Sequence, residues 1–287
     1  MTHEYDPVAP PVALTIAGSD AGGGAGIQAD LKTMTTHGVF GTSVVTATTA
    51  QNTCGVHDVH PVPAEHVLAQ YDAVVDDFPV AAIKTGMLAT AEIVETVTER
   101  LADTSTPVVV DPVMVAATGD RLLSPDAEKA YDALISRATL VTPNADEAAV
   151  LVDGPIETLA DAEAAGRTLV GRGADAALIK GGHLNAGGAV GGIDGGRVVH
   201  DTLVLAPDDA SGVDDPAVHR FENPRIDTDA THGSGCTLSA AIAARLARGE
   251  PLPAAVEAAV GGMSEAIRRG YDVGRGPGPV NPTMLDR

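Results

Sequence analysis

The chain contains 287 residues, of which 44% are apolar and 2% aromatic, so it can bury one sizeable core built mainly from Val, Ala, Leu and Ile. Its 39 acidic and 18 basic residues give a net charge of −21, which disfavours nucleic acid as a partner because this surface would repel the phosphates. Two cysteines exclude a disulfide framework, and we find neither a signal-peptide pattern nor an apolar run of membrane-spanning length, so we expect a cytoplasmic protein without membrane contact.

Short apolar or β-branched runs alternate with helical patterns along most of the chain. We predict strands at residues 12–17, 42–48, 80–83, 107–110, 139–141 and 176–179. We predict helices at residues 26–37, 64–76, 90–102, 125–136, 145–152, 158–171, 235–248 and 253–270. This alternation is typical of βαβ crossovers, in which helices cover both faces of a mostly parallel sheet. We therefore expect a single α/β domain over residues 1–287, with three α/β/α layers and a core from about residue 12 to 282.

Residues 184–219 break this alternation because they are rich in Gly, Asp and Ala. Two β-like pieces, at 197–205 and 219–226, predict a twisted hairpin or edge strands, with a mobile acidic loop near 207–216. The acidic residues of the whole chain are spread along it, and only four of its basic residues are Lys. That balance predicts a halophilic protein, whose self-repulsion is screened in concentrated salt.

The segment Thr231–Cys236 stands directly before a strongly helical stretch. The first N–H groups of a helix have no internal partner and lie at the positive end of its dipole, and glycines let an anion approach them closely. The backbone of residues 233–236 therefore predicts a phosphate or oxyanion cradle with a thiol in it. A helix N-terminus lowers the pKa of a thiol, which favours a reactive Cys236; a small buried residue packing the helix start is the alternative.

A second glycine-rich segment, Gly18–Asp30, follows the first predicted strand. It lacks the Gly-Lys-Ser/Thr of a P-loop, and Gln51 stands where a dinucleotide-binding fold needs an acid, so both are disfavoured. A small-molecule site at the helix start is favoured, and a flexible turn is the alternative. Asp30 and Gln51 side by side suit an aminopyrimidine-like ring, because the acid accepts from N–H groups and the amide pairs with a ring nitrogen. A carboxylate that only stabilises the helix start is the alternative for Asp30.

Further polar residues follow other predicted strands, and ligands of parallel sheets bind beyond the carboxyl ends of the strands. Asn144 and Glu147 are three residues apart on a predicted helix, which suits Mg²⁺ held through water beside nucleotide phosphates. Lys180 ends a strand in a lysine-poor chain and could contact phosphate; a snorkelling lysine is the alternative. His183 and His232 flank glycines without a paired metal-ligand spacing, so we expect loop or capping histidines.

Seven motifs stand in register from about residue 12 to residue 282. They are Ala17–Thr33, Thr49–Thr53, Lys84–Leu88, Asp111–Met114, Thr142–Asn144, Lys180–His183 and Thr231–Ala240. Together they resemble the hydroxymethylpyrimidine/phosphomethylpyrimidine kinase family of thiamine biosynthesis, which belongs to the ribokinase-like superfamily. The resemblance implies an ATP- and Mg²⁺-dependent homodimeric enzyme that phosphorylates 4-amino-5-hydroxymethyl-2-methylpyrimidine and then phosphorylates the monophosphate.

The resemblance also implies roles for individual residues. Cys236 would act at a place where most ribokinase-like enzymes carry an Asp base. The implied anion hole for the γ-phosphoryl group is Gly233, Ser234, Gly235 and Cys236. The implied pyrimidine-binding residues are Gly18, Asp30, Gln51, Met87 and Val113. The implied ATP-binding residues are Asn144, Thr231 and Lys180, and the implied metal-binding residues are Asp111, Asn144 and Glu147. A pyridoxal kinase and a catalytically silent pyrimidine-binding sensor are the rival functions.

Overall fold

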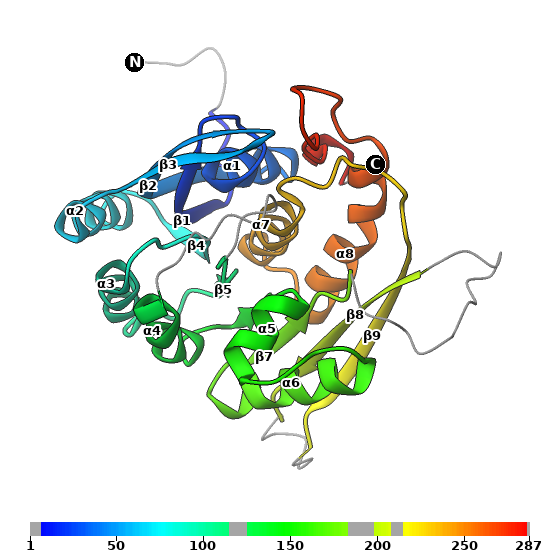
Figure 1. The fold of residues 1–287 in the computed structure, drawn as a ribbon. Helices are drawn as coiled ribbons and strands as arrows, with labels where there is room; N and C mark the ends of the chain where they lie inside the picture. Colours follow the sequence, from blue (N-terminus) through cyan, green and yellow to red (C-terminus); the bar gives the residue numbers. More distant parts are fainter. Residues whose placement is uncertain (1–6, 115–124, 183–197, 208–214, 286–287) are drawn as a thin grey trace.

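The computed structural model describes residues 7–114, 125–182, 198–207 and 215–285. In these residues the strands form a single sheet in the order β3-β2-β1-β4-β5-β6-β7-β8-β9 (Figure 1). The strands are β1 (Val12–Asp20), β2 (Phe40–Asn52), β3 (Gly55–Pro61), β4 (Val80–Thr85), β5 (Val108–Val110), β6 (Leu140–Val141), β7 (Ala176–Ile179), β8 (Val198–Leu205) and β9 (Ala217–Pro224). Strands β2, β1, β4, β5, β6 and β7 run parallel, and β3, β8 and β9 pair antiparallel.

Helices cover both faces of this sheet, which confirms the predicted three layers. One face carries α1 (Gly26–Thr36), α7 (Ser234–Ala247) and α8 (Leu252–Arg268). The other face carries α2 (Ala64–Val75), α3 (Ala91–Leu101), α4 (Pro125–Ile135), α5 (Ala145–Val152) and α6 (Leu159–Gly171). A separate apolar cluster fills the space between the sheet and each helical layer. The central strands are therefore buried on both faces, and β5 and β7 consist entirely of buried apolar residues.

The strand order fixes where a ligand can bind. The chain passes from β1 to β2 on one side of β1, and later resumes with β4 on the other side. Such a switch in strand order opens a crevice at the carboxyl ends of the strands, and ligands of open α/β sheets bind there. The loops that follow β1, β2, β4, β5 and β7 all leave the sheet at this edge, as the sequence motifs require.

Several element boundaries differ from the prediction. Strands β1 and β2 extend to Asp20 and Asn52, and the turn after β2 leads into β3, which sequence patterning did not predict. Strand β3 is mostly exposed, so it lacks the apolar alternation by which strands are recognised. The predicted hairpin is confirmed as β8 paired antiparallel with β9. His183 and the rest of 183–197, together with 208–214 of the predicted acidic loop, lie outside the described residues.

The chain ends in a short 3₁₀ helix, η1 (Pro282–Met284), which packs near α1 and α8. None of the helices in the described part of the chain is both long enough and apolar enough to cross a membrane.

Candidate active site

Asp20 organises the glycine-rich loop between β1 and α1. Its buried carboxylate accepts hydrogen bonds from the backbone N–H of Gly22 at 2.8 Å, Gly24 at 2.9 Å and Ala25 at 2.8 Å. Ala25 is the N-cap of α1 and has no side chain that could cap it, so Asp20 supplies acceptors to N–H groups that would otherwise be unpaired. Asp20 is therefore a principal side chain that fixes the shape of this loop.

Helix α7 begins directly against this loop. Gly233, its N-cap, has a left-handed backbone with φ of 75°, and a Cβ at this position would collide with the carbonyl oxygen of Gly24, so the position requires glycine. Cys236 is the third residue of α7, and the backbone N–H of Gly26, the first residue of α1, donates a hydrogen bond to its sulfur. The first turns of α1 and α7 therefore meet at the Cys236 thiol.

The expectation that Cys236 has a lowered pKa is wrong for this structure. Burial raises the pKa of the Cys236 thiol to about 11, and the nearby cation Lys84 opposes this only in part. The hydrogen bond from Gly26 lowers the pKa but does not compensate for the loss of solvation. In this structure the thiol is therefore protonated at neutral pH.

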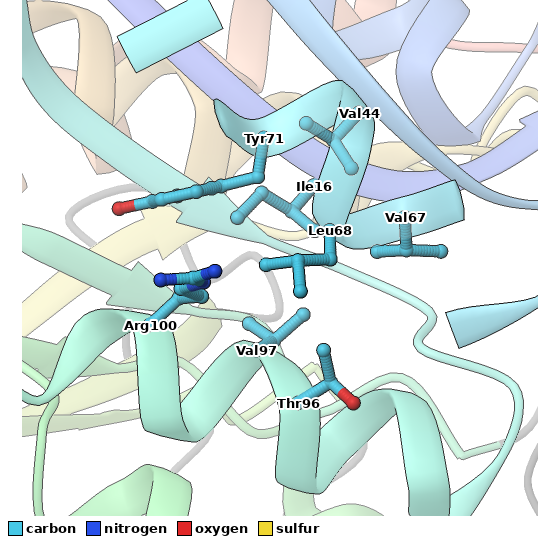
Figure 2. Close-up of a pocket in the computed structure, with 8 residues that line it drawn as sticks. All are labelled: Ile16, Val44, Val67, Leu68, Tyr71, Thr96, Val97 and Arg100. Carbon is cyan, nitrogen blue, oxygen red and sulfur yellow. The ribbon is translucent and has the colours of Figure 1, made fainter. Parts of the chain in front are cut away.

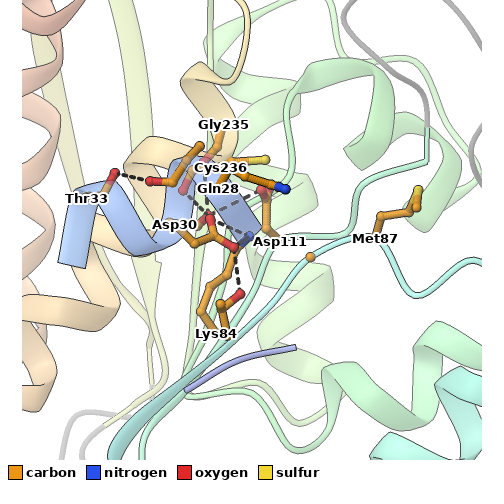
Figure 3. A network of polar contacts seen from close by, with 12 residues as sticks. Gln28, Asp30, Thr33, Lys84, Met87, Asp111, Gly235 and Cys236 are labelled. Atoms are coloured by element: carbon orange, nitrogen blue, oxygen red, sulfur yellow. Dashed lines mark hydrogen bonds and ion pairs between the residues drawn. The ribbon is translucent and has the colours of Figure 1, made fainter. Parts of the chain in front are cut away.

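Asp30 does not line a ligand pocket with Gln51, which corrects the prediction. Its side chain is fully buried, and both carboxylate oxygens pair with Lys84 Nζ, at 3.0 and 2.9 Å. One of those oxygens also accepts a hydrogen bond from Thr15 Oγ1 at 2.6 Å. Burial lowers the pKa of Lys84, but the negative charges of Asp30 and Asp111 together with the hydrogen bond to Asp30 outweigh it and raise the pKa, so Lys84 is a cation. Burial raises the pKa of Asp30, against the influence of Lys84 and Thr15. Figure 3 shows this pair beside Asp111 and Cys236.

Asp111 and Lys180 form a second, partly buried ion pair against the first turn of α7. Asp111 Oδ1 lies 3.1 Å from Lys180 Nζ, and its carboxylate also accepts from Thr142 Oγ1 and Ser239 Oγ, each at 3.3 Å. Gly235 packs on this pair, since a Cβ there would lie 3.2 Å from Lys180 Nζ. Burial lowers the pKa of Lys180, but Asp111 and then Glu147 raise it above its usual value, so a lysine cation stands beside the predicted anion hole.

Asn144 and Glu147 bond to each other at the start of α5. The Asn144 side-chain oxygen accepts from the Glu147 N–H, and Glu147 Oε2 accepts from the Asn144 N–H, each at 2.8 Å. Their spacing is therefore that of a capping box, a use of the pattern that the metal-binding prediction did not consider. Burial raises the pKa of Glu147 to about 7, against the influence of Lys180, whose Nζ lies 4.0 Å from Glu147 Oε2.

Among the described residues, no three or more His, Cys, Asp or Glu side chains are arranged to hold a metal ion. Asp111 and Glu147 are nevertheless brought together around Lys180, as the resemblance implies. Two carboxylates are too few to enclose Mg²⁺, which usually keeps several waters and takes further oxygens from substrate phosphates. The donor set therefore fits an ion held largely by a nucleotide, and does not fit an all-protein cage.

A small apolar cluster, distinct from the two large cores, lies next to the start of the Gly18–Asp30 segment. It contains Met87 and Val113, packed with Ala47, Val59 and Ala89. Gly18 lies against this cluster, since a Cβ there would collide with the Met87 methyl group. Three of the five residues predicted to bind the pyrimidine are therefore neighbours.

Gln51 is half-buried near the end of β2, where its side-chain oxygen accepts from Thr49 Oγ1 at 3.1 Å. Its amide nitrogen makes no hydrogen bond with the described residues and is available to a ligand. Gly22 packs against the Gln51 backbone, since a Cβ there would lie 3.4 Å from the carbonyl oxygen. Because the same loop touches Gly233 through Gly24, Gln51 and the predicted anion hole lie on the same edge of the sheet.

Thr231 and His232 precede the anion hole. Thr231 is exposed, and its carbonyl accepts from the Ser234 N–H at 3.2 Å. His232 is buried, and its Nε2 lies 3.1 Å from Asp20 Oδ2. It bonds to a carboxylate of a distant segment, so the expectation of a loop or capping histidine is only partly met.

A small apolar hollow between α2 and α3 lies elsewhere (Figure 2). Its lining residues Ile16, Val44, Val67 and Val97 belong to the core on the sheet face opposite α1 and α7. It is therefore separate from the site described above.

Sequence reasoning missed two site residues that side-chain contacts now identify. Lys84 was part of a recognised motif but was given no role, although the lysine scarcity that singled out Lys180 applies equally to it. Asp20 ends β1 within the glycine-rich segment, and an acid two residues before a glycine run is a common acceptor for turn N–H groups.

The comparisons with known proteins agree with the resemblance. The model of the phosphomethylpyrimidine kinase family matches residues 20–281. Hydroxymethylpyrimidine/phosphomethylpyrimidine kinase from Streptomyces coelicolor is 48% identical over 282 residues, which cover 98% of this chain and 97% of the relative. An ADP complex of Bacillus subtilis pyridoxal kinase superposes with a TM-score of 0.82 at 33% identity, covering 96% of this chain and 99% of that one.

A second solved structure, phosphomethylpyrimidine kinase from Clostridium difficile, superposes with a TM-score of 0.71 at 36% identity and covers 86% of this chain and 95% of that one. The family match and the full-length sequence identity to hydroxymethylpyrimidine/phosphomethylpyrimidine kinases assign the chain to this family. The superpositions on solved structures agree on the fold. The chain belongs to the phosphomethylpyrimidine kinase family and has the ribokinase-like fold.

Proposed function

We propose that this protein uses ATP to phosphorylate 4-amino-5-hydroxymethyl-2-methylpyrimidine, and then phosphorylates the monophosphate to the diphosphate, for thiamine biosynthesis. The observation that carries the proposal is the meeting of the first turns of α1 and α7 at Cys236. The Lys180–Asp111 pair packs against Gly235 in the first turn of α7, and the Met87–Val113 cluster packs against Gly18 at the start of the glycine-rich segment. A terminal phosphate and an apolar ring with a hydroxymethyl arm can therefore meet beside one thiol.

The residues divide the work of phosphoryl transfer. The backbone N–H groups of Gly233, Gly235 and Cys236 stabilise the charge on the transferred phosphoryl group, whereas that of Ser234 already donates to the Thr231 carbonyl. Lys180 neutralises a further phosphate oxygen. The substrate hydroxyl oxygen attacks the γ-phosphorus as the bond to ADP breaks. Cys236 accepts the hydroxyl proton only as a thiolate, so its thiol must first release its own proton to solvent. Met87, Val113 and the Gln51 amide orient the pyrimidine. Thr231 and Asn144 bind the nucleotide in this proposal.

Mg²⁺ accompanies the nucleotide in this proposal. Asp111 and Glu147 would hold it through water while the phosphates supply its remaining oxygens, and the ion would neutralise the charge of the phosphates. Removing the metal with EDTA is expected to abolish turnover, with full recovery on adding Mg²⁺. We further propose that the protein is a cytoplasmic, halophilic homodimer, which light scattering and activity measurements across KCl concentrations would test.

The main rival is a pyridoxal kinase, because solved pyridoxal kinases superpose over nearly the whole chain. The identity to the pyrimidine kinase of Streptomyces coelicolor, 48%, exceeds the 33% to Bacillus subtilis pyridoxal kinase. Incubation with the hydroxymethylpyrimidine and Mg-ATP in high KCl should give the mono- and diphosphate by mass spectrometry. A higher kcat/KM on pyridoxal would favour the rival. Tight pyrimidine binding without ATP turnover on either substrate would instead identify a sensor.

Substitution of Gln51 tests the substrate side separately. Gln51→Ala should weaken pyrimidine binding by about tenfold, since one buried hydrogen bond to a ring is lost, and should leave the ATP Kd unchanged as an internal control. Equal pyrimidine affinity in the variant and the wild type would remove Gln51 from the site.

A further inference from the structure

Two glycine-containing segments that lie more than two hundred residues apart in sequence are joined by one pair of side chains. Asp20 belongs to the loop between β1 and α1, and His232 directly precedes the N-cap of α7. The distance from His232 Nε2 to Asp20 Oδ2 is 3.1 Å, and both side chains are buried. We call this pair the Asp20–His232 clamp.

At the clamp, the two segments are packed closely against each other. The His232 ring rests on Gly24, where a Cβ would lie 2.5 Å from the ring carbon Cδ2. The next residue, Gly233, fits against the Gly24 carbonyl only because it lacks a side chain. The His232 backbone is also fixed, since its N–H donates to the Gly278 carbonyl at 3.2 Å and its carbonyl accepts from the Val280 N–H at 3.1 Å. Neither segment can shift without moving the other.

The hydrogen bond of the clamp has a defined direction. Burial alone would raise the pKa of Asp20, but the hydrogen bonds from His232 and the loop backbone outweigh it and lower the pKa. The Asp20 carboxylate is therefore ionised and can only accept, so His232 Nε2 carries the proton. The same oxygen that accepts from His232 also accepts from the Gly24 and Ala25 N–H groups. The α1 N-terminus and the α7 N-terminus thus share one carboxylate oxygen.

We propose that the Asp20–His232 clamp positions the anion hole against the substrate loop, so that His232 and Asp20 are positioning residues for phosphoryl transfer. This inference rests on the proposed function of the site and adds to it two residues that touch neither substrate. Without the clamp, the backbone donors of residues 233–236 lose their fixed distance to the loop that borders Gln51. Displacements of about 1 Å at a reacting centre cost about 10²-fold in rate, whereas ground-state binding tolerates them better.

The test compares two substitutions of His232 with a control. His232→Gln keeps a side-chain N–H that can donate to Asp20, and His232→Leu keeps the bulk but removes the donor. His200→Leu is the matched control, because His200 lies on β8, paired at 3.6 Å with Glu222 of β9. We expect His232→Leu to lower kcat for the pyrimidine by about 30-fold or more with less than about threefold change in its KM, and His232→Gln to keep at least about a third of kcat.

A second measurement tests the clamp independently of which substrate the enzyme phosphorylates. The affinity ratio of AMP-PCP to ADP, measured by calorimetry, reports the γ-phosphate contribution and requires no phosphoryl acceptor. His232→Leu should reduce this ratio by about tenfold relative to the wild type and to His200→Leu. If the wild type fails to phosphorylate the pyrimidine, the proposed function is wrong, but this ratio still tests the clamp.

Asp20→Asn alone serves as the second variant where His232→Leu folds poorly, and where both fold it completes a double-mutant cycle. If His232 acts through its hydrogen bond to Asp20, the double variant loses little more kcat than Asp20→Asn alone. The inference is overturned if folded His232→Leu stays within threefold of wild-type kcat. It is also overturned if His232→Gln loses as much activity as His232→Leu, or if the losses of Asp20→Asn and His232→Leu are additive.

Discussion

Burial raises the pKa of the Cys236 thiol, whereas a position at a helix N-terminus lowers the pKa of a thiol. Burial dominates and raises its pKa to about 11, so below that pH the thiolate fraction rises about tenfold per pH unit. In a Cys54→Ala background, where Cys236 is the remaining cysteine, the rate of alkylation by iodoacetamide should therefore rise about tenfold per unit from pH 7 to pH 9.5. A rate that levels off below pH 9 would show that the helix N-terminus prevails instead.

The ion pair between Lys84 and Asp30 is buried next to Asp111 and Cys236 of the site. Substitution of either residue tests its contribution to the stability of the fold. Lys84→Met leaves an unpaired buried carboxylate, which should cost about 3–5 kcal/mol in the free energy of unfolding. Lys84→Met combined with Asp30→Leu removes both charges and should recover at least half of that loss. Urea denaturation of the three proteins measures both values. A double variant less stable than Lys84→Met would contradict this account.

Asp30 also shows what the sequence could have predicted at the level of one residue. Ile27, Asp30 and Met34 follow the i, i+3, i+7 spacing of a buried helical face, and all three are buried on α1. That spacing indicates that the Asp30 side chain is directed into the core. A buried carboxylate needs a cation as partner, and Lys84 is a lysine in another of the motifs. The strand-end rule placed the right loops at one edge, but it does not determine which way each side chain points.

In helix α5, one carboxyl group both caps the helix and titrates beside the site. Glu147 completes the capping box with Asn144, and burial raises its pKa from 4.5 to about 7. The folded protein therefore binds this proton more tightly than the unfolded chain, so wild-type stability falls as the pH rises from about 4.5 to about 7. Glu147→Gln preserves the capping acceptor without titrating.

The stability of Glu147→Gln relative to the wild type should consequently increase with pH, by about 1–3 kcal/mol between pH 4.5 and pH 8. Urea unfolding at several pH values measures the difference. Asp146→Asn, which removes an exposed carboxylate from the same helical turn, is the matched control. A constant difference across this range would mean that Glu147 is ionised throughout, held so by Lys180.

Most helices and strands could be predicted because each shows a regular spacing of apolar residues or a residue type that marks its end. The helices that pack on the sheet carry apolar stripes, and the buried parallel strands are short apolar runs. Strand β3 could not be predicted, since its side chains are mostly exposed and its existence depends on pairing with β2. The contact between Gly24 and Gly233 was likewise invisible, because it follows from packing between segments at opposite ends of the chain.

For the whole molecule, the excess of acidic residues is the property that the sequence shows most directly. Some surface arginines are shared among acids, since Arg167 lies between Glu163 and Asp215, and Arg220 also contacts Glu163. These pairs tie α6 to the segment around β9, but 18 basic residues cannot balance 39 acidic ones. Repulsion among the remaining carboxylates therefore opposes the compact state at low salt.

Salt should relieve this repulsion, because the screening length falls from about 10 Å at 0.1 M to about 3 Å at 1 M. We expect the Tm to rise by at least about 5 °C between 0.1 M and 2 M KCl, equivalent to roughly 2 kcal/mol, within a single cooperative transition if the chain is one domain. Sorbitol at matched osmolality is the control for effects on hydration alone. Screening predicts that most of the rise comes below 0.5 M KCl, and a Tm that does not increase with KCl would reject a halophilic adaptation.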